Sequence, residues 1–97
     1  MLRIASVQMN INKDKDRNLS KILHYLKKAY KKKASMVCFP EHCIMPDENN
    51  LKPIGPFLDA IGKDCKKFSI WCIVGSYAKE FGKIFNVIYL IDGHGKI

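Results

Sequence analysis

The sequence predicts an α/β fold with the element order β-α-β-α-β-β. Short apolar segments of strand length alternate with two longer segments. In these longer segments the apolar residues recur every three or four positions, as they do on one face of a helix. The last two apolar segments follow each other with no helix between them. Strands that are joined by helical crossovers are expected to be parallel, whereas the last two strands are expected to form an antiparallel pair.

The size of the chain predicts one domain, which spans residues 1–97. Hydrophobic residues make up 47% and charged residues 27%, which is typical of a globular protein. The longest apolar runs, Ile70–Val74 and Val87–Ile91, are far shorter than the ~20 residues of a membrane-spanning helix. The N-terminal residues show no signal-peptide pattern. We therefore expect a cytoplasmic protein without a membrane partner.

The first half of the chain predicts two strands and one helix. A strand is expected over Leu2–Met9, because these residues are apolar on both faces, as in a strand that is covered on both sides. A helix is expected over Asp16–Lys32, where one apolar stripe runs along the segment. Lysines gather at its end, and they complement the helix dipole there. The second strand is expected over Met36–Phe39.

The second half begins with an irregular segment, His42–Pro56, and loops of this length are usually functional. A second helix is expected over Pro56–Lys67, with the proline as its first residue. Gly62 weakens that helix by about 1 kcal/mol relative to alanine. Two further strands are expected, over Ile70–Gly75 and Ile84–Asp92.

The C-terminal residues contain a strong turn signal, Asp92-Gly93-His94-Gly95. Lys96–Ile97 then has the character of the start of a fifth strand.

The formal charge is +8, from 17 lysines and arginines against 9 acidic residues. Only Arg3 and Arg17 are arginines. Nucleic-acid surfaces usually include several arginines, because the planar guanidinium binds phosphate and guanine through two hydrogen bonds. The lysine excess therefore favours a solvated surface over a nucleic-acid site.

Glu41 is the candidate catalytic residue. It follows Pro40 directly beyond the second predicted strand, and ligands of open α/β sheets bind beyond the carboxyl ends of the strands. We expect the long loop to shield this carboxylate partly, so that it acts as a general base. A solvated loop glutamate and a helix-capping carboxylate are the structural alternatives.

Three potential metal ligands, Cys38, His42 and Cys43, lie within six positions. Zinc sites usually pair ligands on turns and add a second pair elsewhere, which this sequence lacks, so we expect no metal site. Cys43 is not expected to be a nucleophile activated by His42, because adjacent residues of an extended segment point to opposite sides. Without a secretory context the four cysteines are expected to be free thiols. The remaining assignments are core positions for Cys65, Cys72 and Trp71, a surface or boundary position for His24, and a turn position for His94.

A resemblance to a known family rests on several segments that follow one another in order. They are LRIASVQMN at the first strand, Asn18 in the helix, Val37-Cys38-Phe39-Pro40-Glu41, Ile73-Val74-Gly75-Ser76, Phe85-Asn86-Val87, Leu90-Ile91-Asp92 and Gly95-Lys96-Ile97. Together they resemble the N-terminal part of the nitrilase superfamily, the carbon–nitrogen hydrolases. The resemblance covers the whole chain.

The resemblance implies the N-terminal part of a four-layer αββα sandwich. It also implies a hydrolase of amide, carbamoyl or nitrile C–N bonds that uses a glutamate, a lysine and a nucleophilic cysteine. Glu41 takes the place of the glutamate, whereas the family's lysine and cysteine come later than Ile97. Lys96 comes too early to be the catalytic lysine, so we interpret it as a turn residue. The resemblance further implies a small-molecule substrate, no metal or organic cofactor, and a homo-oligomer at full length. Alone, the 97-residue chain is expected to be inactive.

Two positions depart from the family pattern. Lys33 stands where the family commonly closes the first helix with glycine, which predicts a mildly strained left-handed cap. His42 and Cys43 stand where small or apolar residues are usual, which leaves the subfamily open.

A second hypothesis is a small basic α/β binding domain, complete at 97 residues, for nucleic acid or an acidic partner. The charge of +8 and the absence of two catalytic residues motivate it. The clustering of lysines at a helix end and the lack of an aromatic platform count against it. The salt dependence of binding to generic DNA or RNA distinguishes the two hypotheses.

Overall fold

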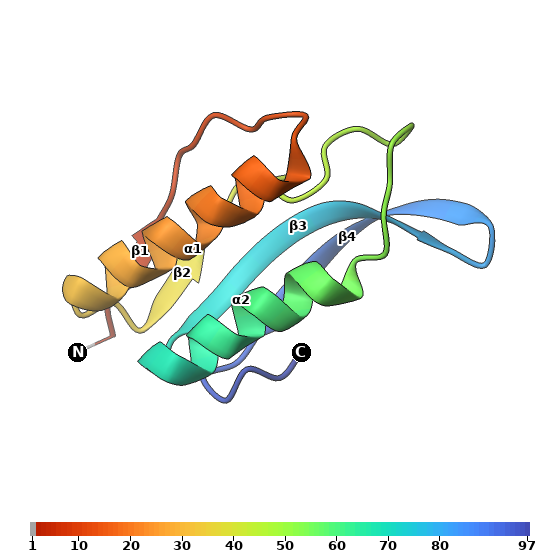
Figure 1. Cartoon of the computed structure of the whole chain (residues 1–97). Helices are drawn as coiled ribbons and strands as arrows, with labels where there is room; N and C mark the ends of the chain where they lie inside the picture. The colour runs from red at the N-terminus through yellow and green to blue at the C-terminus, as the bar shows by residue number, and fades with distance from the viewer. Residues whose placement is uncertain (1) are drawn as a thin grey trace.

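The computed structural model describes residues 2–97. Within this range six elements follow one another (Figure 1): β1 (Ile4–Ser6), α1 (Lys15–Lys31), β2 (Met36–Cys38), α2 (Gly55–Phe68), β3 (Trp71–Glu80) and β4 (Lys83–Ile91). The predicted order β-α-β-α-β-β is confirmed.

The four strands form one sheet in the order β1-β2-β3-β4. β1 pairs with β2 and β2 pairs with β3 in parallel. β3 and β4 form a long antiparallel hairpin, from Cys72 opposite Ile91 to Glu80 opposite Lys83. The predicted parallel and antiparallel pairings are therefore confirmed, because the two helical connections carry the chain back to the start of the next strand.

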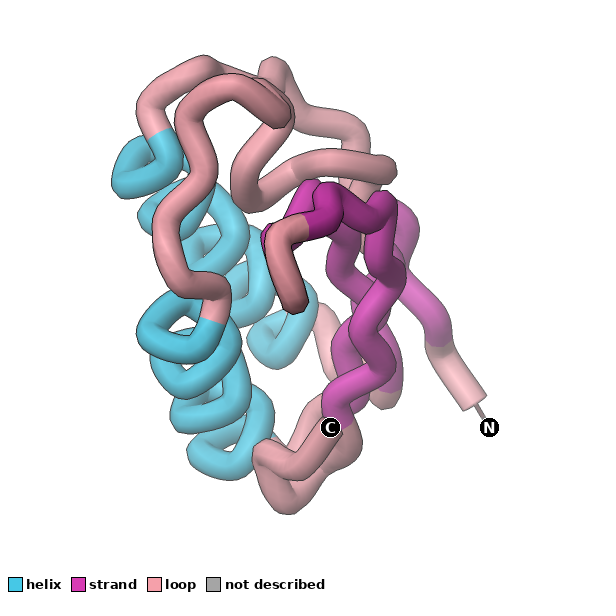
Figure 2. The backbone as a smooth tube through the Cα atoms, turned by 90° about the vertical axis from the view of Figure 1, so that its right-hand side faces the viewer, coloured by secondary structure: helices cyan, strands magenta, loops and turns pink. Residues whose placement is uncertain are grey.

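Both helices lie on the same face of the sheet, so the chain forms one helical layer on one sheet layer (Figures 1 and 2). This arrangement agrees with the expected N-terminal part of an αββα sandwich. The core lies between the layers, and its fully buried side chains include Ile22, Leu26, Val37, Ile44, Ile61, Ile70, Cys72, Val74 and Ile91. Neither helix described within residues 2–97 is both long and apolar enough to span a membrane.

Helix α1 begins and ends at specific caps. The Asp14 side chain accepts hydrogen bonds from the backbone N–H groups of Asp16 and Arg17, which have no partner within the helix. After the helix, Lys33 adopts the left-handed conformation with φ of 62°. The predicted left-handed cap at Lys33 is thus confirmed, and each predicted end of the helix is one residue too late.

Helix α2 begins at Gly55, one residue before Pro56. Gly62, which lowers the helix propensity, has a packing role that the sequence does not reveal. A Cβ at this position would lie 2.8 Å from the carbonyl oxygen of Gly95 in the turn after β4. The helix and this turn therefore meet backbone to backbone, and an alanine at position 62 would clash.

Three of the strand predictions are wrong by more than one residue. β1 is shorter than Leu2–Met9, because its one partner within residues 2–97 is the three-residue strand β2. β3 continues past Gly75 to Glu80, because β4 pairs with it along the whole hairpin. Lys96–Ile97 does not form a strand; instead the Lys96 carbonyl accepts a hydrogen bond from the Asp92 N–H (2.8 Å), which closes the turn.

The sheet face opposite the helices, here called the open face, is apolar and exposed. Trp71, which was predicted to lie in the core, is 43% exposed, so this prediction is wrong. Its neighbour Cys72 points to the helices, and successive side chains of a strand alternate between faces. Cross-strand neighbours share a face, and the exposed apolar residues of the open face are Ile4, Trp71, Ile84, Ile88 and Leu90.

The open face predicts self-association of the isolated chain. Contiguous exposed apolar surface, together with the two sheet edges that are unpaired within residues 2–97, favours association between copies. Light scattering coupled to chromatography is expected to give a mass well above 11.1 kDa. The double variant Ile88→Lys/Leu90→Lys, which places charges on this face, is expected to lower the mass. A monodisperse wild-type monomer that unfolds cooperatively would contradict this expectation.

Candidate active site

The chain leaves the sheet directly after β2. The Phe39 N–H donates to the Ile73 carbonyl (2.9 Å), which continues the parallel ladder. The next such bond runs from the Ile44 N–H to the Gly75 carbonyl (3.2 Å). Between these two hydrogen bonds β3 covers two residues (73 to 75), whereas the segment after β2 covers five (39 to 44). In a regular parallel ladder both strands would cover the same number of residues. The three extra residues, Glu41–Cys43, form an excursion out of the sheet.

Beyond the excursion the chain returns to β3. The Met45 N–H donates to the Ser76 hydroxyl (3.1 Å), and the Met45 carbonyl accepts from the Tyr77 N–H (3.2 Å). The Ser76 hydroxyl, which is fully buried, donates in turn to the Tyr77 carbonyl (2.7 Å). β3 therefore fixes the backbone on both sides of the excursion.

Asn18 ties the excursion to α1. Its side chain is fully buried, and its amide nitrogen donates to the carbonyls of Asn12 (2.6 Å) and Ile44 (3.0 Å). Its amide oxygen accepts from the Asn12 N–H (2.7 Å). From the sequence, Asn18 entered only as part of a family resemblance. The signal in the sequence is the position of Asn18, four residues before the buried Ile22 and in line with the apolar stripe. A polar side chain at such a position is expected to be buried and hydrogen-bonded.

The two residues that follow Glu41 point in different directions. The His42 ring stacks on Tyr77, with 4.1 Å between the ring centroids and 14° between the planes. Cys43 is fully buried, and its thiol donates to the Gly75 carbonyl (3.6 Å). The prediction that His42 does not activate Cys43 agrees with this geometry, although its reason was wrong. His42 is not extended; it adopts a left-handed backbone with φ of 53°.

The cysteines of this chain are buried or half-buried free thiols. Burial raises the pKa of Cys43 to about 11, so this side chain is protonated at neutral pH. Because the thiolate is the reactive form of cysteine, Cys43 is a poor nucleophile. Cys65 and Cys72 are fully buried in the core, as predicted, and Cys38 is half-buried. No three His, Cys, Asp or Glu side chains in the described range cluster in a way that could hold a metal ion.

Glu41 and His42 line a surface depression of about 380 Å³. Its other lining residues are Ile11, Lys13, Pro46 and Asp47. Glu41 itself is exposed, so the expectation that the long loop shields it is wrong for this chain. The loop instead turns inward at Cys43–Met45, whose side chains are buried in the core. The depression presents one carboxylate of the excursion at the end of the sheet where the parallel strands finish.

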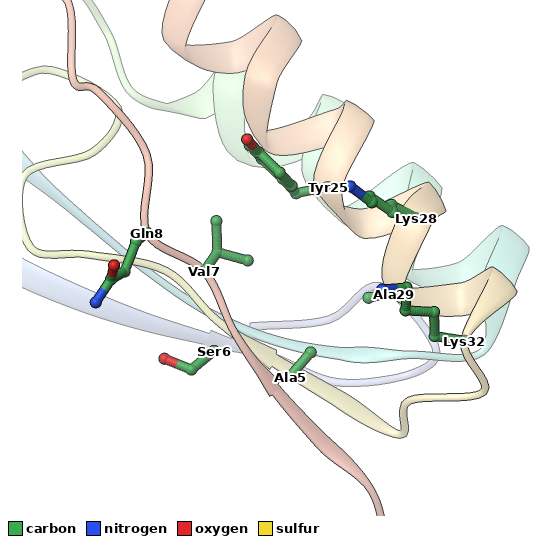
Figure 3. Close-up of a pocket in the computed structure, with 8 residues that line it drawn as sticks. All are labelled: Ala5, Ser6, Val7, Gln8, Tyr25, Lys28, Ala29 and Lys32. Atoms are coloured by element: carbon green, nitrogen blue, oxygen red, sulfur yellow. The ribbon is translucent and has the colours of Figure 1, made fainter.

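A second depression lies between β1 and α1 (Figure 3). Val7 and Tyr25 point into the space between strand and helix, whereas Ser6 and Gln8 point away from the helix. Its lining contains neither a carboxylate nor a thiol. The depression at Glu41 is the candidate active site because it is lined by the candidate general base.

The remaining sequence candidates lie elsewhere. Lys96 follows the carboxyl end of β4. Because β4 is antiparallel to β3, the carboxyl end of β4 lies beside the start of β3, at the opposite end of the strands from Glu41. This placement agrees with its interpretation as a turn lysine. His24 is exposed on α1, and His94 is exposed in the turn after β4, as predicted.

Comparisons with known proteins agree with this fold. The family model for the carbon-nitrogen hydrolases matches residues 3–97. No curated protein matches the chain. An amidase from Nesterenkonia sp. has a similar structure, with a TM-score of 0.85 and 16% sequence identity over 98% of this chain and 40% of that one.

Two further structures of the amidase from Nesterenkonia sp. AN1 are similar to the same extent. A cysteine-to-alanine variant in complex with butyramide has a TM-score of 0.86 at 17% identity, over 98% of this chain and 40% of the amidase. A glutamate-to-glutamine variant shows covalent addition of the acetamide moiety of fluoroacetamide at the active-site cysteine. Its TM-score is 0.86 at 16% identity, with the same two coverages.

These similarities locate the chain within a larger fold. It spans about 40% of the length of the amidases it matches, and the match places it in the N-terminal part. With a family match over residues 3–97 and a matching sheet and helix arrangement, the chain belongs to the carbon–nitrogen hydrolase family and corresponds to the N-terminal part of its fold.

Proposed function

We propose that this chain supplies the general base, Glu41, to a hydrolase that cleaves amide C–N bonds. The observation that carries the proposal is the position of Glu41 in a fixed excursion at the carboxyl end of β2, where it lines an accessible depression. Family membership supports the reaction class. Residues 1–97 are then the N-terminal part of one catalytic domain, whose lysine and nucleophilic cysteine come from a segment beyond Ile97.

The proposed reaction is covalent and proceeds in two halves. In the first half Glu41 takes the proton of the cysteine thiol, and the thiolate attacks the amide carbonyl carbon. The C–N bond breaks, the leaving nitrogen takes the proton from Glu41, and a thioester remains on the cysteine. In the second half Glu41 takes a proton from water, which attacks the thioester and releases a carboxylic acid. The proton returns to the cysteine sulfur, while the lysine stabilises the negative charge of each tetrahedral intermediate.

We propose small aliphatic amides as the substrate class. A cysteine-to-alanine variant of the matched amidase has been observed in complex with butyramide, and a double variant in complex with acrylamide. Carbamoyl compounds and nitriles are the alternatives that the same thiolate chemistry would accept. We further propose that the complete enzyme is a cytoplasmic homo-oligomer. In a complete αββα sandwich the open face packs on the second sheet of the same domain, so it does not specify how many copies assemble.

Two assays test the proposed function. Residues 1–97 alone are expected to release no ammonia from butyramide, because removal of a nucleophile leaves only weak residual catalysis. The complete enzyme that contains these residues is expected to release ammonia and butyric acid in equal amounts. Turnover at an ordinary enzymatic rate by the 97-residue chain would contradict the assignment of the nucleophile to another segment. If the complete enzyme turned over no amide, no carbamoyl compound and no nitrile, the proposed reaction class would be contradicted.

A further inference from the structure

We propose that Gly75 is a positioning residue for Glu41, an inference that rests on the proposed function. Gly75 is buried in β3, and the excursion passes directly over its α-carbon. A Cβ at this position would lie 3.2 Å from the backbone nitrogen of His42 and 3.5 Å from the Cα of Glu41. Because residue 75 has no side chain, the Glu41–His42 backbone lies a few tenths of an ångström closer to β3 than a methyl group would allow.

Gly75 also holds the far side of the excursion. Its carbonyl accepts hydrogen bonds from the Ile44 N–H (3.2 Å) and from the Cys43 thiol (3.6 Å). The same residue therefore lies next to the start of the excursion and accepts hydrogen bonds from its far side through the carbonyl. Because the backbone on both sides of the excursion is hydrogen-bonded to β3, a displacement of Glu41 and His42 cannot be relieved by movement of a free chain end.

The contacts around the excursion determine how it yields to a methyl group. His42 stacks on Tyr77, which lies two residues further along the same face of β3. The left-handed backbone of His42 is a sparsely populated conformation that persists only where its surroundings enforce it. On the other side, the carbonyl oxygen of Val87 would lie 3.6 Å from the added Cβ. A methyl group at position 75 is therefore expected to move the Glu41–His42 backbone outward by a few tenths of an ångström.

General-base catalysis is sensitive to such a shift. The base must lie within about 2.6–3.2 Å of the atom whose proton it takes. A misplacement of about 1 Å can cost about 10²-fold in rate. Gly75→Ala is accordingly expected to lower kcat about 10-fold, and Gly75→Val, which carries a larger branched side chain, about 10²-fold. KM is expected to change less than kcat, because the substrate-binding surfaces remain in place.

Two other glycines provide matched controls in the same chain. A Cβ at Gly55 would meet no atom within 4 Å, so Gly55→Ala adds a methyl group in open space. A Cβ at Gly62 would meet the Gly95 carbonyl oxygen at 2.8 Å, a closer contact than any at Gly75 but at the opposite end of the sheet from Glu41. Gly62→Ala is expected to lower the thermal midpoint while leaving kcat of the folded enzyme unchanged. Gly55→Ala is expected to change neither.

The deciding experiment is a double-mutant cycle in the complete enzyme, with kcat, KM and the thermal midpoint of each variant. A residue that acts through Glu41 loses its effect when Glu41 is already replaced. Gly75→Ala is therefore expected to lower kcat in the wild-type background and to have almost no effect in the Glu41→Gln background. Equal losses of kcat in both backgrounds would overturn the inference, because they would indicate a merely structural role.

A second outcome distinguishes this inference from the proposed function. If Glu41→Gln abolishes turnover but Gly75→Ala leaves kcat unchanged, the positioning role is wrong and the role of Glu41 stands. If Glu41→Gln leaves turnover unchanged, the proposed function is wrong and the inference falls with it. Should Gly75→Val fail to fold, the comparison of Gly75→Ala with Gly62→Ala still decides between the outcomes.

Discussion

Replacement of Glu41 by glutamine is expected to lower amide turnover by the complete enzyme about 10²–10⁴-fold, the usual loss when a general base is removed. Glutamine has nearly the same shape as glutamate, but it cannot take a proton from the thiol or from water. Glu41 is exposed and forms no ion pair within residues 2–97, so the substitution leaves no buried charge without a partner. The thermal midpoint is therefore expected to stay close to that of the wild type. Ammonia release from butyramide measures the loss.

A matched control and a chemical probe sharpen this experiment. Glu48 is an exposed glutamate of the same loop that does not line the depression, so Glu48→Gln is expected to retain full activity. In the matched amidase, the active-site cysteine is covalently modified by fluoroacetamide in a glutamate-to-glutamine variant. If the same reagent modifies the cysteine in Glu41→Gln of the complete enzyme, the loss of amide turnover is assigned to the missing base and not to a blocked cysteine. Wild-type turnover by Glu41→Gln would contradict the general-base role.

Asn18→Ala is expected to produce the largest loss of stability. The substitution removes the hydrogen-bond partners of the Asn12 N–H, the Asn12 carbonyl and the Ile44 carbonyl. A buried polar group that loses its partner costs about 1–3 kcal/mol. Water can reach the Asn12 side, which is only part-buried, so we expect a decrease of about 3 kcal/mol in the free energy of unfolding. Chemical denaturation of the complete enzyme measures this decrease.

Two further substitutions separate the hydrogen bonds of Asn18 from its volume. Asn18→Asp keeps the size of the side chain but directs carboxylate oxygens at two carbonyl acceptors, so it is expected to be at least as destabilising as alanine. Asn50→Ala alters an exposed asparagine and is expected to change stability by less than about 0.5 kcal/mol. An Asn18→Ala enzyme as stable as the wild type would show that the network does not hold the loops together.

The order and pairing of the strands could be predicted because they follow from local patterns. Apolar periodicity marks the helices, and a helix between two strands makes those strands parallel. The left-handed cap at Lys33 was also predictable, because Lys33 stands at the position where the family commonly closes the first helix with a glycine. These features depend on residues that are close together in the sequence.

The predictions that were wrong, and the features that could not be predicted, depend on contacts with residues far away in the sequence. Trp71 was expected in the core because its strand is apolar on both faces, but only one face is covered within residues 2–97. The length of the Glu41–Cys43 excursion is set by which residues bond to β3, and local propensity carries no information about that register. The roles of Gly62 and Gly75 are likewise invisible in the sequence, because each depends on the backbone of a distant segment.

The location of the acyl group tests the central claim most directly, namely that Glu41 serves a cysteine outside these 97 residues. The complete enzyme is mixed with butyramide, quenched in acid at short times, and analysed by intact-mass and peptide-mapping mass spectrometry. We expect a transient butyryl thioester on one cysteine beyond Ile97, which forms much more slowly in Glu41→Gln. A butyryl group on Cys38, Cys43, Cys65 or Cys72, or equal rates of acylation in the wild type and Glu41→Gln, would contradict the account.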